Sequence, residues 1–197
     1  MRRRLPPLPA PALLGTALVV ALLSAWTGPV AAGAAGAPTV RTVIGPRQLE
    51  SPGGLALDTA GDLFVADTGH CRVLVVPAQS AFRYGRQLQA GRVVTVAGGS
   101  CTGAHAMGRP SGLAVDLHGD LYVAEATAQR VQEIRADGTA GLFTVAGSGL
   151  DQPTSVAVDG SGDVFIADTA HCRVVALPAR DTMLFGQVVR AGQLSTV

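Results

Sequence analysis

The feature that most constrains the fold is a segment that occurs three times. The copies read SPGGLALDTAGDLFVADTGHCRVLVVP (51–77), RPSGLAVDLHGDLYVAEATAQRVQEIR (109–135) and QPTSVAVDGSGDVFIADTAHCRVVALP (152–178). Each copy holds three short apolar stretches with a Gly-Asp turn between the first two, which is a strand-turn-strand pattern. A fourth apolar stretch follows as VVTVAG (93–98) and LFTVAG (142–147). Four short strands repeating about every 43 residues are typical of a β-propeller blade.

The copies are not evenly spaced. They begin 58 and then 43 residues apart, because 15 extra residues stand between the third and fourth strands of the first copy. The insertion recurs after the third copy, so that 77–98 resembles 178–197. The stretch RTVIG (41–45) resembles a fourth strand and predicts a strand ahead of the first blade.

We therefore predict an all-β chain that holds an incomplete propeller. Propellers close at four to eight blades, whereas three full repeats and a flanking strand are present. The terminal blades should expose open edges and faces through which such an arc can self-associate. The predicted blades span about 51–98, 109–147 and 152–197.

The repeat resembles a known family. Its pattern, P-x-G-[LIV]-A-[LV]-D-x-x-G-[DN]-[LIV]-[FY]-[VI]-A-D-[TS]-x-x-x-R-[VI], is similar to the NHL repeat over all three copies, residues 51–178. The resemblance implies a propeller of a family that is most often six-bladed. The form with the repeated insertion is similar to secreted NHL proteins of actinobacteria. In this family the turn after the second strand usually reads Asp-x-x-Asn-x-Arg, whereas here His-Cys or Ala-Gln precedes the arginine.

The first 37 residues read as a targeting segment rather than as part of the propeller. Three arginines at 2–4 precede an uncharged apolar run at 13–26, and small residues follow at 28–37. This order is that of a secretory signal peptide, with cleavage expected near Ala32. The alternative is an uncleaved membrane anchor, because no charge occurs between residue 4 and Arg41. We expect an extracytoplasmic or secreted protein whose propeller begins near residue 38.

The charge balance bears on the class of partner. Without the three arginines at 2–4, 12 arginines face 14 acidic residues, a formal charge of −2. Nucleic-acid binding requires a basic surface that this balance does not supply. We therefore expect a protein, peptide or glycan partner, and a membrane only if the signal segment is retained.

An acidic residue and an arginine recur in the turn between the second and third strands of every copy. An Asp in a turn accepts hydrogen bonds from nearby backbone N–H groups, and a following arginine can reach the same acidic group. Because the motif recurs in each blade, we assign it to the scaffold. The turn residues are Asp67, Arg72, Glu125, Arg130, Asp168 and Arg173.

The cysteines predict one disulfide in an exported chain. Cys71 follows the second strand, and Cys101 lies in the loop into the next blade, on the same face of a propeller. The middle copy has neither cysteine, so the turn and loop cysteines are gained or lost together. We predict a Cys71–Cys101 disulfide, with no partner for Cys172.

A metal site is the alternative for the same region. His70, Cys71, Cys101 and His105 could offer nitrogen and sulfur ligands to zinc. The spacing of Cys101 and His105 is loose and no CxxC pair is present. An oxidising compartment also favours the disulfide, so we predict no cofactor, with zinc or calcium as the alternative.

No residue set stands apart from the repeat as a catalytic group. Asp58, Asp116 and Asp159 end the first strand of every copy, whereas a catalytic acid and base would break the repeat symmetry. The chain has no GxSxG, HExxH, P-loop or EF-hand pattern. We therefore predict a non-enzymatic binding scaffold that uses its loop face. The alternatives are a metal-dependent lyase or lactonase-like propeller enzyme and an extracellular sensor module.

Overall fold

The computed structural model describes residues 41–197 except 46, 104–105 and 140–141. All strands described below lie within the unit Val43–Val197. The predicted signal peptide lies outside the described residues. No helix in the described ranges is long and apolar enough to cross a membrane.

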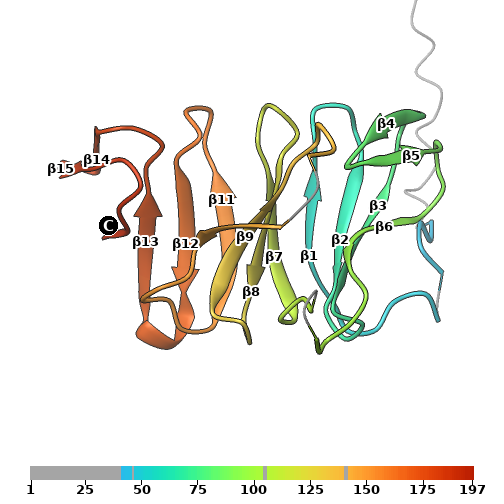
Figure 1. Cartoon of the computed structure of the whole chain (residues 1–197), viewed down its shortest axis with the longest axis horizontal. Coiled ribbons are helices and arrows are strands. Elements are labelled where there is room, and N and C mark those ends of the chain that lie inside the picture. The colour runs from blue at the N-terminus through green and yellow to red at the C-terminus, as the bar shows by residue number, and fades with distance from the viewer. Residues whose placement is uncertain (1–40, 46, 104–105, 140–141) are drawn as a thin grey trace, which may run out of the picture. The chain divides into compact units, whose positions relative to one another are not determined.

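Three four-stranded antiparallel sheets form this unit, and we call them blades 1, 2 and 3. Blade 2 lies between the other two, with its first strand packed against the first strands of both neighbours (Figure 1). This arrangement confirms the predicted all-β class and is that of partial propeller blades. The strands are β1 (Pro52–Leu57), β2 (Leu63–Asp67), β3 (Arg72–Val76) and β6 (Val94–Gly98) in blade 1; β7 (Pro110–Val115), β8 (Leu121–Glu125), β9 (Arg130–Ile134) and β10 (Phe143–Ala146) in blade 2; and β11 (Pro153–Val158), β12 (Val164–Asp168), β13 (Arg173–Leu177) and β16 (Ser195–Thr196) in blade 3.

The hairpin between the first two strands of each blade is held by the aspartate that ends the first strand. In blade 1 the Asp58 carboxylate accepts hydrogen bonds from the backbone N–H groups of Ala60 and Asp62, both at 2.9 Å. Gly61 has φ +84°, a left-handed conformation that costs glycine little. Asp116 and Asp159 accept the same two bonds in the other blades, so these three aspartates are turn-forming residues.

Side chains of adjacent blades meet in two hydrophobic clusters. One lies between blades 1 and 2 and includes Phe64, Val73 and Leu113. The other lies between blades 2 and 3 and includes Val131 and Val156. Central strands such as β8 are buried on both faces, which explains why their sequences are apolar without alternation.

The insertion predicted from the repeat spacing forms a small hairpin of its own. In blade 1 it consists of β4 (Ala81–Arg83) and β5 (Arg86–Leu88), and in blade 3 of β14 (Thr182–Leu184) and β15 (Gln187–Val189). Leu88 and its equivalent Val189 are buried and anchor the hairpins.

The prediction of a strand at RTVIG (41–45) was wrong. Residues 41–45 form bends and irregular chain rather than a strand. A strand needs a partner for its backbone groups, and the third strand of each blade is already paired with a fourth strand of the same blade.

Candidate functional site

The acidic turn residue of blade 1 is fully buried and binds three groups. The Asp67 carboxylate accepts a hydrogen bond from the Glu50 backbone N–H at 2.7 Å and one from Arg72 Nε at 2.7 Å. His70 Nδ1 lies 2.9 Å from the same carboxylate. Burial alone raises the pKa of Asp67, but the hydrogen bonds from Glu50, Arg72 and His70 outweigh it and hold the pKa below its ordinary value.

Blade 3 repeats this arrangement. Asp168 accepts hydrogen bonds from the Asp151 backbone N–H and from Arg173 Nε, both at 2.7 Å, and His171 Nδ1 lies at 2.9 Å. Here too burial raises the pKa of Asp168, and the hydrogen bonds from Asp151, Arg173 and His171 lower it overall. Each arginine also donates to a backbone carbonyl of the segment that precedes its blade, at Gln48 and Gly149. The turn therefore ties each blade to the chain that enters it.

Blade 2 performs the same task with different side chains. The buried Glu125 accepts hydrogen bonds from the Gly108 backbone N–H at 2.6 Å and from Arg130 at 3.1 Å. Ala128 stands where the other blades have histidine. Glu125 Oε1 and Arg130 Nε have no hydrogen-bond partner among the described residues. The longer side chain thus preserves the link to the preceding segment while leaving the turn less well bonded.

Cys71 and Cys101 are joined in a disulfide with Cα atoms 5.1 Å apart, the pairing expected from the sequence. Their sulfurs are bonded to each other and therefore are not thiolate ligands in this structure. His70 faces carboxylates instead, with Nε2 3.5 Å from Glu50, and His105 lies outside the described residues. Within the described ranges, no group of three or more His, Cys, Asp or Glu side chains is placed to hold a metal ion. Cys172 is an exposed free thiol.

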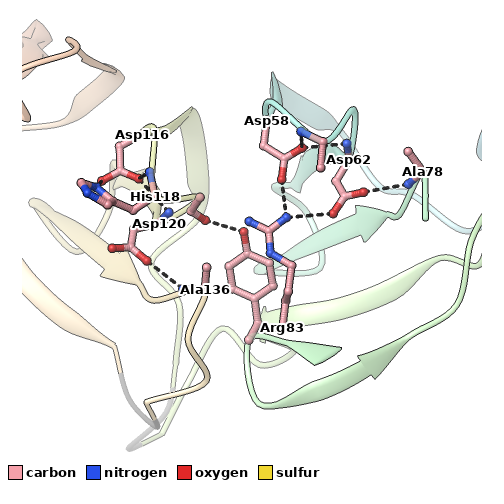
Figure 2. Close-up of polar contacts among 11 residues, drawn as sticks. Asp58, Asp62, Ala78, Arg83, Asp116, His118, Asp120 and Ala136 are labelled. Atoms are coloured by element: carbon pink, nitrogen blue, oxygen red, sulfur yellow. Dashed lines mark hydrogen bonds and ion pairs between the residues drawn. The ribbon is translucent and has the colours of Figure 1, made fainter. Parts of the chain in front are cut away.

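A second polar cluster lies at the opposite ends of these strands, beside the insertion hairpin of blade 1. Figure 2 shows Arg83 reaching Asp58 and Asp62, with guanidinium-to-carboxylate distances of 2.5 and 3.2 Å. Desolvation lowers the pKa of Arg83, but its hydrogen bond to Asp58 and the charges of both aspartates raise it overall. Asp62 also accepts a hydrogen bond from the Ala78 backbone N–H at 2.7 Å.

Tyr84 fixes the hairpin to the next blade. Its hydroxyl donates a hydrogen bond of 2.6 Å to the Gly119 carbonyl, and its backbone N–H donates to the Ala136 carbonyl at 3.1 Å. Its ring packs edge-on against Phe64 and lies 5.3 Å from the Arg83 guanidinium. Burial is the main reason that the pKa of the Tyr84 hydroxyl is raised.

Sequence reasoning missed Arg83 and Tyr84. The insertion is absent from the second copy, and Leu184 and Phe185 stand at the equivalent places in the third. Comparison of the repeats therefore does not indicate that Arg83 and Tyr84 make polar contacts beside the insertion hairpin. The available signal was an arginine between two aromatic residues, Phe82 and Tyr84.

A cleft of about 510 Å³ lies beside Tyr84, between blades 1 and 2. One wall is the hairpin turn at 84–86 together with residues 96–98 of the edge strand β6. The other wall is the end of β9, the following loop at 138–139, and Leu142. Arg86 and Arg135 line it, and Arg135 is positioned by a hydrogen bond of 2.9 Å to Glu133 and by the ring of Phe143. The walls thus combine strand backbone, small residues and positive charge.

Comparison with known proteins bears on this fold. A model of the NHL repeat matches residues 49–76 and 150–177, which are the first and third copies. A search of curated proteins gives no significant match.

Many solved chains resemble this chain in fold, and three of them show the extent of the likeness. A chain of the nidogen/laminin complex is 16% identical, with 74% of this chain and 47% of that chain covered and a TM-score of 0.53. Streptogramin B lyase is 15% identical, with 70% and 39% covered and a TM-score of 0.50. A catalytically inactive virginiamycin B lyase from Staphylococcus aureus, with quinupristin, is 10% identical, with 73% and 42% covered and a TM-score of 0.51.

At these identities the likeness concerns the fold alone. The chain spans less than half the length of each of these three solved chains. The repeat matches and the three four-stranded sheets agree with one another. This is a chain with NHL repeats and a β-propeller-like fold.

Proposed function

We propose that this protein is a non-enzymatic binding module whose cleft between blades 1 and 2 takes an extended acidic peptide segment of a partner protein. The observation that carries the proposal is the make-up of the cleft, in which an edge strand lies beside two arginines. The recurring acidic residues favour a binding role over a catalytic one, because each is already engaged in the scaffold. Asp67, Glu125 and Asp168 are each used to hold a turn.

The edge strand favours a peptide in extended conformation. β6 is the last strand in the order of blade 1, so one side of its backbone has no partner within that sheet. Extended peptides add to such edges through main-chain hydrogen bonds, and pockets beside the edge select their side chains. Gly138 lets the loop after β9 approach the hairpin turn on the other wall closely, because a Cβ at this position would lie 2.9 Å from the Gly85 backbone nitrogen.

The arginines favour a negatively charged partner. Arg86 is exposed and lines one wall of the cleft, and Arg135 lies on the opposite wall. The charge of Arg86 raises the local concentration of a negatively charged ligand, and Arg135, which is paired with Glu133, adds hydrogen-bond donors on the other wall. An acidic peptide therefore fits this site better than a neutral or basic one.

Peptide selection tests the proposal. A phage-displayed random peptide library selected on the wild-type protein should enrich acidic sequences, and a fluorescein-labelled copy of the best one should bind in an anisotropy titration. Arg86→Glu should weaken its binding about tenfold, or 1.4 kcal/mol. Arg180→Glu is the matched control, because Arg180 is exposed on blade 3, away from the cleft, and donates a hydrogen bond to the Ser161 hydroxyl. Equal binding of the peptide to the wild type and to Arg86→Glu would refute the proposed site.

We also propose that the protein is exported. The positive residues at 2–4 and the apolar run at 13–26 have the order of a signal peptide, and a disulfide fits an oxidising compartment. Expressed with its own N-terminus in a bacterium that secretes proteins, it should be recovered from the medium. N-terminal sequencing should then show a start near residue 33. Recovery in the cytosol with residue 1 or 2 as the first amino acid would contradict export.

A further inference from the structure

The outward side of blade 3 has the residues of a blade-to-blade interface, but no blade within the described residues packs against it. Val73 of blade 1 and Val131 of blade 2 are equivalent, and both are fully buried against the next blade. Val174 is the third member of this set, and it is 46% exposed. A shallow hollow of about 160 Å³ lies beside it. We call this surface the end face, formed by Phe165, Ala167, Val174 and Phe185.

An aromatic pair makes the equivalence more specific. Phe64 and Tyr84 of blade 1 pack edge to face at 5.7 Å, and blade 2 covers them. Phe165 and Phe185 of blade 3 pack in the same way at 6.1 Å. Tyr84 is 7% exposed, whereas its equivalent Phe185 is 77% exposed. The insertion hairpin of blade 3 therefore presents Phe185 at the position from which Tyr84 of the blade 1 hairpin packs against blade 2.

The opposite end of the unit presents the complementary surface. Leu113 of blade 2 and Val156 of blade 3 are buried against the blade before them. Leu55 of blade 1 is their equivalent and is 64% exposed, and Leu57, two residues further along β1, is also exposed. We call Leu55 and Leu57 the start face.

We propose that the end face of one chain binds the start face of a second copy of the same chain. Both surfaces belong to one molecule, and the two internal interfaces show that surfaces of these two kinds fit each other. Covering these apolar side chains removes them from water, which favours association. Two copies related by a two-fold axis would make this contact twice, which favours a discrete dimer. The described blades of such a pair number six, within the range in which propellers close.

The internal interface between blades 1 and 2 indicates how Phe185 would sit. Tyr84 contacts the carbonyls of Gly119 and Ala136, whose equivalents on the start side of the second copy are Gly61 and Ala78. Phe185 has no hydroxyl, so its ring would pack against this site without the hydrogen bond to the glycine carbonyl. The intermolecular contact is therefore more apolar than its internal counterpart.

One residue distinguishes the end face from the internal interfaces. Gly54 and Gly112 allow the first strands of neighbouring blades to approach closely, since a Cβ at either would lie 2.5 Å from the backbone of the next blade. Ser155 occupies this place in blade 3. The first strands of the two copies must therefore stand further apart here, and Ser155→Gly should strengthen the association.

Sedimentation velocity of the full chain tests the proposal. All variants carry Cys172→Ser, because this exposed thiol could otherwise join two chains covalently. The reference protein should sediment as a discrete dimer at micromolar concentration. Leu55→Glu on the start face and Phe185→Glu on the end face should each shift the dimer to monomer. Leu117→Glu should leave it intact, because Leu117 is equally exposed but belongs to the β7–β8 hairpin rather than to either face.

Three results would overturn the proposal. A reference protein that stays monomeric up to about 100 µM, where even contacts weak on the affinity scale are populated, would show that the faces do not bind. A dimer that survives either Leu55→Glu or Phe185→Glu would show that the faces do not meet each other. Dissociation by Leu117→Glu would place the contact elsewhere.

Discussion

Replacing Tyr84 with alanine should lower the free energy of unfolding by about 3–5 kcal/mol, the usual cost of truncating a buried aromatic side chain. The change removes the ring from the cluster between blades 1 and 2 and breaks the hydrogen bond to the Gly119 carbonyl. It also leaves Arg83 without the ring beside it. Urea unfolding followed by circular dichroism measures the effect.

Phe185→Ala is the matched control, because Phe185 occupies the same place in the hairpin of blade 3 and is exposed. Both variants should be measured in the Leu55→Glu background, which removes the proposed association. There Phe185→Ala should cost less than about 1 kcal/mol, as is usual for exposed positions. Equal losses in the free energy of unfolding for the two variants would show that the contribution of Tyr84 does not come from its contacts with blade 2.

Replacing Asp67 with alanine should cost about 2–3 kcal/mol, because it removes a buried carboxylate that accepts hydrogen bonds from a backbone N–H and from the partly exposed Arg72. The change leaves the Glu50 backbone N–H without its acceptor and Arg72 without its carboxylate. Asp181→Ala serves as the control, since Asp181 is exposed and its ion pair with Arg190 should contribute less than about 1 kcal/mol. A loss at Asp67 no larger than at Asp181 would contradict the scaffold role of the turn.

The same variant should change the dependence of stability on pH. The pKa of Asp67 is lower in the folded protein than its ordinary value of 3.8, so the unfolded chain binds more protons as the medium is acidified. The contribution of Asp67 is therefore fully present above about pH 5 and is lost as pH falls through the folded pKa. Between about pH 5 and pH 2 the wild type should lose more stability than Asp67→Ala. Parallel losses over this range would mean that Asp67 is not held ionised by its partners.

Much of the fold follows from the repeat, because a propeller blade places the same residue type at the same turn each time. Asp58 and its equivalents were expected to end the first strand as scaffold residues, and each accepts backbone hydrogen bonds in the turn that follows this strand. The disulfide partners could be named because their two loops recur on the same face. The assignment of RTVIG as a strand failed, because a matching sequence forms a strand only where a partner edge is available.

The cleft could not be predicted, because it depends on residues that do not repeat. Arg86 aligns with Gln187, and the loop that carries Gly138 has no counterpart of the same length in blades 1 and 3. The same holds for Tyr84 and Phe185, which align in sequence but differ in exposure according to whether a blade follows. Equivalent positions in the repeats reveal a missing contact only when their exposure is known. An apolar residue that is buried in one blade and exposed in another indicates where a neighbouring blade is expected.

The most direct test of that reasoning is to mix the two face variants, Leu55→Glu and Phe185→Glu, both with Cys172→Ser, in equal amounts. Each variant retains one intact face, so a heterodimer can form through the unaltered end face of one and the unaltered start face of the other. Sedimentation velocity should show monomers for each variant alone and a species of twice that mass in the mixture. A mixture that contains only monomers, from variants of a protein that is dimeric in its reference form, would contradict the pairing of these two faces.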